Sequence, residues 1–273
     1  MPAQPQTRQQ ALKALLQETQ EVLTKQFPEA KTLSRSRSKT DWLKKLTHQE
    51  TDQALKLKIT QEEFQATMDK LNQLVGQTAI DYQDETLLYL EQQLSDILGF
   101  NVSASLEDHY IPFIGGVMQA MPHLKRTPTD ELEDHEEVLE AGLREKRSFY
   151  GWFSPSQLTA QAKLYERYYF SLPLSTQPQW QADPKAQAKW FKYRKLIMVN
   201  PKRKLAVVGV VADIGPFNLV RAQFGGSPEV IRLGQIWHPQ NKGRVALFFV
   251  QDPDDQVPLG PIKLDPFKQL ATV

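Results

Sequence analysis

The sequence predicts an α+β protein, with an α-helical N-terminal part followed by a β-rich C-terminal part. Over about the first hundred residues, apolar side chains recur at the spacing of one helix face. In the last third, two short runs rich in Val, Leu and Phe, from Leu205 to Val211 and from Val245 to Val250, suit strands buried on both faces. Residues 100–128 mix large apolar residues with Pro and Gly, so we expect an ordered connector there.

Helices are expected in sequence up to Gly99. The first, from Gln10 to Phe27, carries one apolar stripe that we expect to pack on neighbouring helices; contact with a protein partner is the alternative. A polar, basic piece at 34–39 is interpreted as a solvated linker. Caps and stops then indicate a helix after Thr40 or Asp41 that carries Trp42, Leu43 and Leu46, a helix from the Thr60–Glu63 capping box to Gly76, and a helix from Leu87 to Leu98 closed by Gly99.

These elements divide the chain into three expected parts. The first is an N-terminal helix and polar linker at residues 1–39, and the second is an α-helical module with the ordered connector at 40–145. The third, at 146–273, is a domain resembling a small β-barrel. A chain of 273 residues is long enough for two ordinary domains of about 150 residues each.

Composition excludes some classes of partner and chemistry. The chain has 33 basic and 32 acidic residues, a formal net charge of +1, so no global field would attract nucleic acid or an acidic membrane surface. There is no cysteine, which excludes disulfides and thiolate catalysis. No apolar run approaches the roughly 18 residues of a membrane span, and the first residues lack the apolar core of a signal peptide.

A helix is also expected from Asp130 to Ala141, with Asp130 as its cap and Gly142 as its stop. His123 and Asp130 are seven residues apart, and His135 follows five residues later. These are metal-ligand types, and one metallopeptidase family uses the first interval. We nevertheless predict no metal site and no cofactor, because Asp130 is needed as a helix cap and the third ligand of that family is expected much further along the chain.

An aromatic-rich zone extends from Tyr150 to Tyr193. Aromatic faces stack well on sugar rings, since the C–H groups of the sugar meet the negative π-face. Trp180, Trp190 and Tyr193 are the candidates for a sugar-binding role, and both tryptophans have polar neighbours in sequence. The alternative is that the aromatic side chains line the seam between the helical module and the β domain.

A predicted hairpin leads directly to a single carboxylate. Strands are expected at 195–200 and 205–212, joined by a turn, and Asp213 follows, with Gly215 and Pro216 behind it. Such an acid would be presented at the rim of a barrel, although capping a turn is the alternative role. The acidic loop at 251–256 is interpreted as a solvated turn rather than a calcium site, and 257–262 is expected to close the barrel edge.

The C-terminal sequence resembles a known barrel family. The similar pieces are, in order, Asp213-Ile214-Gly215-Pro216-Phe217, Ser227-Pro228-Glu229-Val230 leading to Leu233-Gly234, and Gly243-Arg244 before the last apolar run. They resemble the six-stranded double-psi β-barrel of the rare lipoprotein A type, which expansins and some endoglucanases share, over roughly residues 165 to 262. The resemblance implies a polysaccharide partner, often peptidoglycan or cellulose, and a location in the cell envelope or outside the cell. We therefore expect an export segment or anchor that this sequence does not show.

The resemblance implies lytic transglycosylase chemistry with Asp213 as general acid and base. In that reaction the sugar's own hydroxyl attacks the anomeric carbon, so one carboxyl group that first donates and then accepts a proton is sufficient. Hydrolysis, in contrast, uses two carboxyl groups. Ser227 and Glu229 are the further residues expected at the substrate.

Two departures from the family weaken the catalytic interpretation. Gly225 stands where the family has a second acid, and no histidine lies near Gln187, where the family has one. Glu229 is a possible substitute carboxylate. Two alternatives therefore remain beside a peptidoglycan-cleaving enzyme: a non-catalytic, expansin-like polysaccharide-binding barrel that uses Trp180, Trp190 and Tyr193, and an envelope scaffold whose helical part binds another protein.

Overall fold

The computed structural model describes residues 59–76, 85–135, 138–145, 148–215, 219, 221–236 and 242–267. The helices expected before residue 59, the linker at 34–39, and Pro216 and Phe217 lie outside these residues. Ile59–Asp265 forms one compact unit. Within the described residues, no helix combines the length and the apolar character needed to cross a bilayer.

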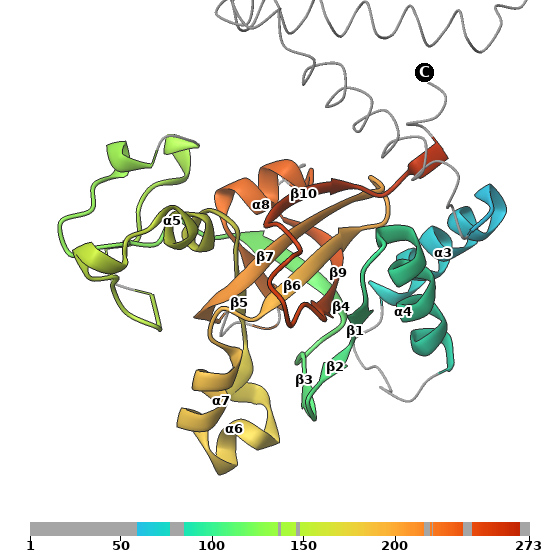
Figure 1. Ribbon diagram of the computed structural model, residues 1–273, viewed down its shortest axis with the longest axis horizontal. Coiled ribbons are helices and arrows are strands. Elements are labelled where there is room, and N and C mark those ends of the chain that lie inside the picture. Colours follow the sequence, from blue (N-terminus) through green and yellow to red (C-terminus); the bar gives the residue numbers. More distant parts are fainter. Residues whose placement is uncertain are drawn as a thin grey trace, which may run out of the picture. The chain divides into compact units, whose positions relative to one another are not determined.

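A closed six-stranded β-barrel forms the centre of the unit (Figure 1). Going round the ring, the strands follow the order β9, β4, β8, β5, β7 and β6, and β6 pairs again with β9. The β4–β8 and β5–β7 pairs are parallel and the other pairs are antiparallel, so the barrel is mixed. Its strands are β4 (Gly115–Ala120), β5 (Tyr169–Leu172), β6 (Lys195–Asn200), β7 (Leu205–Ile214), β8 (Phe224–Gly226) and β9 (Lys242–Val250). The predicted α+β class with a small barrel is confirmed at this level.

The β6–β7 hairpin lies where the sequence predicts it. Its strands pair antiparallel from Lys195 opposite Val210 to Asn200 opposite Leu205. Almost every residue of both strands is buried, because helices and loops cover the outside of the barrel while the apolar core fills its inside. Gly209 is required in β7, since a Cβ atom there would collide with the carbonyl oxygen of Tyr168.

Two further strands pair outside the ring. β1 (Val102–Ser103) pairs with β9, and β10 (Gly260–Lys263) pairs with β7. β2 (Ser105–Leu106) and β3 (His109–Tyr110) form a separate small hairpin. Because β1 and β4 come from the stretch expected to be a connector, the compact unit crosses the boundary expected at 145/146.

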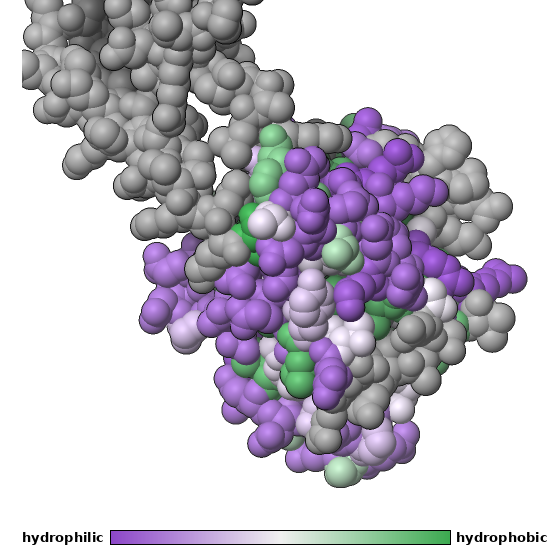
Figure 2. Space-filling model, turned by 90° about the vertical axis from the view of Figure 1, so that its right-hand side faces the viewer, coloured by the Kyte–Doolittle hydropathy of each residue, from purple (hydrophilic) through white to green (hydrophobic). Residues whose placement is uncertain are grey.

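Helices lie on several sides of the barrel (Figure 1). The predicted capping box begins α3: the Oγ1 atom of Thr60 accepts from the Glu63 N–H, and the Glu63 carboxylate accepts from the Thr60 N–H at 2.6 Å. α3 and α4 lie on the side away from α5, and the visible face on their side is mainly hydrophilic, with scattered apolar side chains (Figure 2). The helices are α3 (Gln61–Leu74), α4 (Glu85–Leu98), α5 (Ala160–Arg167), α6 (Pro178–Ala182), α7 (Pro184–Phe191) and α8 (Pro228–Leu233).

The prediction of a helix from Asp130 to Ala141 is wrong. The segment instead contains two short 3-10 helices, η2 (Leu132–Asp134) and η3 (Leu139–Ala141), and Val138 between them has a left-handed backbone with φ 45°. Asp130 does not cap a helix, because its carboxylate accepts from the backbone N–H of Arg126 at 2.7 Å and lies 2.8 Å from the His135 ring. Two further 3-10 helices, η4 (Pro155–Gln157) and η5 (Leu174–Thr176), complete the elements named here.

The acidic turn after β9 is fixed to the barrel by Lys195 of β6, which pairs with the carboxylates of Asp252 and Asp255. Asp252 accepts from Lys195 Nζ on β6 at 2.6 Å and from the backbone N–H groups of Gln256 and Val257. The turn is therefore anchored rather than freely solvated at this residue.

The Asp252 carboxylate should contribute to the loss of stability at acidic pH. Burial alone would raise the pKa of Asp252, but the hydrogen bonds from Lys195, Val257 and Gln256 outweigh burial and lower it. A carboxyl group whose pKa falls on folding stabilises the protein above its unfolded-state pKa, about 3.9, and this contribution is lost as the pH falls through the folded-state value. We expect Asp252→Asn to flatten the decline in the free energy of unfolding below about pH 4. Urea unfolding over a pH series measures this, and a decline as steep as in the wild type would contradict it.

Candidate functional site

Asp213 lies near the end of β7, as predicted, but its carboxylate is not open to solvent. The residue is 2% exposed, so the expectation that its side chain is presented at the barrel rim is wrong. One oxygen, Oδ1, accepts from the backbone N–H of Phe149 at 2.9 Å, and the other forms an ion pair with Arg144. Both partners precede Asp213 by more than 60 residues in the chain, so long-range contacts hold the buried carboxylate.

An aromatic cluster lies next to this ion pair. Phe149 contacts Tyr150 and Trp180, with ring centroids 5.4 and 5.9 Å apart, and Tyr150 in turn contacts Tyr193 at 6.0 Å. Tyr193 stacks on Tyr165 at 4.6 Å and on Phe153 at 6.0 Å. We call Phe149, Tyr150, Phe153, Tyr165, Trp180 and Tyr193 the aromatic cluster. It joins two of the three predicted sugar-binding residues to the segment that holds Asp213.

The cluster has both an exposed and a buried side. Phe149 is 51% exposed, and nearby in sequence Trp152 is 47% exposed, which is unusual for such large apolar side chains. The hydroxyl of Tyr150 is buried and has no hydrogen-bond partner among the described residues. Burial, and next the charge of Asp213, raises the pKa of Tyr150, and burial raises the pKa of Tyr193 to about 12. Both phenols are therefore neutral at physiological pH.

Trp190, the third predicted sugar-binding residue, packs elsewhere. Its ring stacks on His109 with centroids 3.7 Å apart, and its Nε1 donates to the Glu107 carboxylate at 2.9 Å. The guanidinium of Arg194 lies over the Trp190 ring, 4.4 Å from its centroid. These contacts tie α7 to the β2–β3 hairpin, so Trp190 has a structural explanation that Trp180 lacks.

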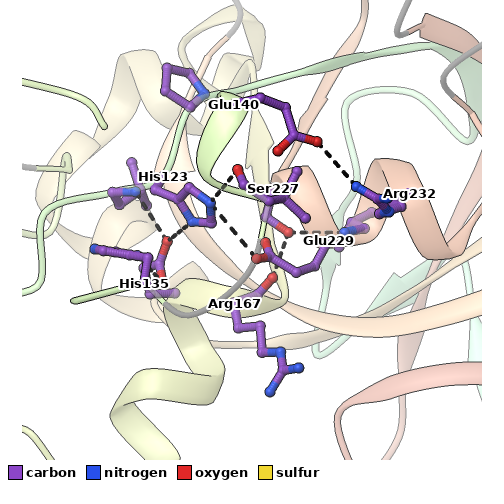
Figure 3. Close-up of polar contacts among 12 residues, drawn as sticks. His123, His135, Glu140, Arg167, Ser227, Glu229 and Arg232 are labelled. Carbon is purple, nitrogen blue, oxygen red and sulfur yellow. Dashed lines mark hydrogen bonds and ion pairs between the residues drawn. The ribbon is translucent and has the colours of Figure 1, made fainter. Parts of the chain in front are cut away.

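Ser227 and Glu229 face inward at the beginning of α8 (Figure 3). Ser227 caps the helix, since its Oγ accepts from the Val230 N–H at 3.2 Å and donates to the Arg167 carbonyl at 2.6 Å. Glu229 is 3% exposed, and burial raises its pKa above the ordinary value. Its Oε1 atom lies 3.8 Å from His123 Nε2. Neither side chain lies on the surface, and Glu229 belongs to a second group of buried polar residues.

That second group is a buried polar cluster, which we define as His123, Arg126, Asp130, His135, Glu166 and Glu229. Glu166, on α5, is its centre: Oε1 lies 3.0 Å from His123 Nδ1, and Oε2 lies 3.1 Å from His135 Nδ1. Arg126 Nη2 donates to the same Oε2 at 2.9 Å. Burial would raise the pKa of Glu166, but the hydrogen bonds with His123 and His135 and the charges of His135 and Arg126 lower it to about 2.

Only part of this cluster was predictable from the amino-acid sequence. His123, Asp130 and His135 have a recognisable spacing, but we predicted no metal there, in part because of a helix cap at Asp130 that the structure does not contain. Glu166 follows His135 by 31 residues on an ordinary-looking helix, and nothing in its local pattern marks it. His123, His135 and Glu166 each offer one ligand atom, and these three atoms lie within 4.8 Å of one another. The three residues could therefore hold a metal ion.

Tyr169, on β5, is a buried phenol that is influenced by charges of both groups. It is fully buried, and its hydroxyl donates to the Pro122 carbonyl at 2.6 Å. Burial raises its pKa, and the charges of Asp213, Glu166 and Glu229 add to the effect while Arg144 opposes it. The charges of both groups of residues therefore act on one phenol.

No protein-family model matches the chain, and searches of curated proteins and of solved structures return no match.

The Arg144–Asp213 pair gives a direct stability prediction. Arg144→Met leaves the buried carboxylate without its counter-charge; losing one partner of a buried pair costs up to about 5 kcal/mol. Since Arg144 is 34% exposed, we expect a smaller loss in the free energy of unfolding, about 1–3 kcal/mol, measured by urea denaturation.

Arg232→Met is the matched control, because Arg232 pairs with Glu140 and both side chains are more than half exposed. That variant should change stability by less than about 1 kcal/mol. Combining Arg144→Met with Asp213→Asn should recover much of the loss, since the buried charge is then removed too. Equal losses for Arg144→Met and Arg232→Met would contradict the account of the pair.

Proposed function

We propose that this protein binds cell-wall polysaccharide through the aromatic cluster and the neighbouring Arg144, as a non-catalytic barrel of the rare lipoprotein A and expansin type. The observation that carries the proposal is the gathering of Trp180 and Tyr193 with the half-exposed Phe149 beside the Asp213 ion pair. Exposed aromatic faces provide stacking surfaces for sugar rings. A partly exposed guanidinium provides several hydrogen-bond donors for hydroxyl or carboxylate oxygens of a glycan.

The proposal includes the assignment of the barrel to the double-psi family. A closed six-stranded ring with two parallel pairs, β4–β8 and β5–β7, supports a double-psi topology. The resemblance of the sequence around Asp213 and Ser227 supports the same assignment. It implies a location in the cell envelope or outside the cell, with peptidoglycan as the first polysaccharide to test.

The contacts of Asp213 favour binding over catalysis. A general acid must approach the glycosidic oxygen to within hydrogen-bonding distance. Here one carboxylate oxygen accepts from the Phe149 N–H, and the other is paired with Arg144. Gly225, in β8, stands where the family that the sequence resembles has its second acid. That position therefore offers no second carboxylate to act together with Asp213. Both contacts of the Asp213 carboxylate are explained by a structural role, in which it holds Arg144 and Phe149 on the barrel.

A lytic transglycosylase is the second candidate, and one observation favours it. Arg144 is one-third exposed, so a glycan that displaced its guanidinium would reach the Asp213 carboxylate. In this alternative Asp213 is the general acid and base. The scaffold alternative, in which the helical part binds another protein, remains a proposal from the sequence.

Co-sedimentation with purified sacculi tests the binding proposal. The wild type should sediment with sacculi, and Trp180→Ala and Phe149→Ala should each weaken binding roughly fivefold, which corresponds to the loss of about 1 kcal/mol of aromatic stacking. Trp190→Ala, the same truncation outside the cluster, should bind like the wild type, with circular dichroism confirming that each variant is folded.

Absence of sedimentation, or an equal loss in Trp190→Ala, would refute the proposal. Analysis of the soluble fraction separates the two candidates. Release of anhydro-muropeptides by the wild type but not by Asp213→Asn would favour the transglycosylase, whereas binding without release supports the non-catalytic barrel.

A further inference from the structure

We propose that His123, His135 and Glu166 form a binding site for a divalent metal ion of the zinc type. The ligand atoms already converge, since the Nδ1 atoms of His123 and His135 lie 3.0 and 3.1 Å from the two oxygens of Glu166. One ligand atom from each residue can be chosen so that all lie within 4.8 Å of one another. Around a tetrahedral zinc ion with bonds near 2.1 Å, ligand atoms are roughly 3.4 Å apart. Small side-chain shifts would therefore bring all three onto one ion.

The outer nitrogens of both histidines have the partners that metal-bound histidines use. A histidine that binds a metal through one nitrogen usually donates its other N–H to a carboxylate or a carbonyl, which fixes the ring. His135 Nε2 lies 2.8 Å from Asp130 Oδ2. His123 Nε2 lies 3.4 Å from the Val138 carbonyl oxygen and 3.8 Å from Glu229. Both rings thus present Nδ1 to Glu166 and Nε2 to an oxygen.

Glu229 provides an independent observation. It is 97% buried, and its Oε2 atom has no hydrogen-bond partner among the described residues. An oxygen left without a partner at such burial is costly. Because the same carboxyl group lies beside His123, it has unused capacity to fix the ring once the ring is metal-bound (Figure 3).

Arg126 competes for the position of the ion. Its Nη2 donates to Glu166 Oε2 and lies 3.1 Å from His135 Nδ1, and its Nε also donates to Glu166 Oε2, at 3.2 Å. Both contacted atoms are among the three proposed ligand atoms. A further anchor lies outside the ligand set, since Nη1 donates to the Asp134 carbonyl at 3.2 Å. The guanidinium can therefore keep this last contact while Nη2 and Nε yield to a metal. It follows that removing the arginine charge should strengthen metal binding, an effect that a purely structural cluster does not predict.

A metal here would join parts of the chain that are distant in sequence. His123 follows β4, His135 follows η2, and Glu166 lies on α5. Because the intervening segment has mainly short 3-10 helices, a metal ion would fix it against α5 and the barrel. The site does not depend on polysaccharide binding, since none of its ligands belongs to the aromatic cluster.

Metal titration of the full chain tests the site. After dialysis against a chelator, the wild type should bind Zn(II) in competition with a chromophoric chelator, melt at a higher temperature with Zn(II), and give the visible absorption of tetrahedral Co(II). Glu166→Gln should abolish these signals. Asp130→Asn keeps all three ligands and should weaken binding roughly 10- to 100-fold. Arg126→Met should bind Zn(II) more tightly than the wild type.

Glu140→Gln is the matched control, because Glu140 is an exposed carboxylate that pairs with Arg232 and not with the cluster. It should bind Zn(II) like the wild type. Failure of the wild type to bind Zn(II) or Co(II), or equal binding by the wild type and Asp130→Asn, would overturn the proposal. So would Arg126→Met binding no more tightly than the wild type. The Asp130 and Arg126 variants keep the test decisive if Glu166→Gln does not fold.

Discussion

The ion pair between Asp213 and Arg144, with the hydrogen bond from the Phe149 N–H, is the contact on which the rest of the site depends. It connects the end of a barrel strand to a segment that has little regular secondary structure of its own. That segment leads directly into the aromatic cluster, so its attachment decides where the aromatic rings lie. A buried carboxylate with these partners can hold such a segment, because separating them would leave a charge without compensation away from water.

The Asp213 ion pair and the buried polar cluster both attach the same irregular segment. In both groups, residues of the irregular segment after β4 pair with carboxylates of the barrel or of α5. Carboxylate charges of both groups add to the rise in the pKa of Tyr169. One group is closed by an arginine from that segment, and the other is closed by Arg126 together with two histidines. The proposed metal site and the Arg144–Asp213 pair would therefore both hold residues of the same irregular segment.

Local patterns predicted the elements that local interactions determine. The Thr60–Glu63 capping box and the β6–β7 hairpin are found as expected, because caps and apolar runs act over a few residues. β4 was not predicted as a strand. Its sequence, with two glycines and a glutamine, lacks the β-branched run of β7, and it is a strand because it pairs between β8 and β9.

Long-range contacts explain what the sequence could not show. Arg144 precedes Asp213 by 69 residues, so the burial of the carboxylate follows from a loop that no periodicity places there. The false helix at 130–141 has the same origin, because Asp130 is used by Arg126 and His135 rather than by a helix end. Trp180 and Trp190 have similar neighbours in sequence, and only the fold separates a cluster member from a residue packed on His109.

The most direct measurement of the central claim is an NMR titration of the protein with soluble peptidoglycan fragments, following the assigned indole N–H signals. If the aromatic cluster is the glycan surface, the Trp180 signal should shift in a saturable manner while the Trp190 signal, whose N–H donates to Glu107, stays in place. A shift of Trp190 alone, or no shift of either signal at saturating fragment, would contradict the account.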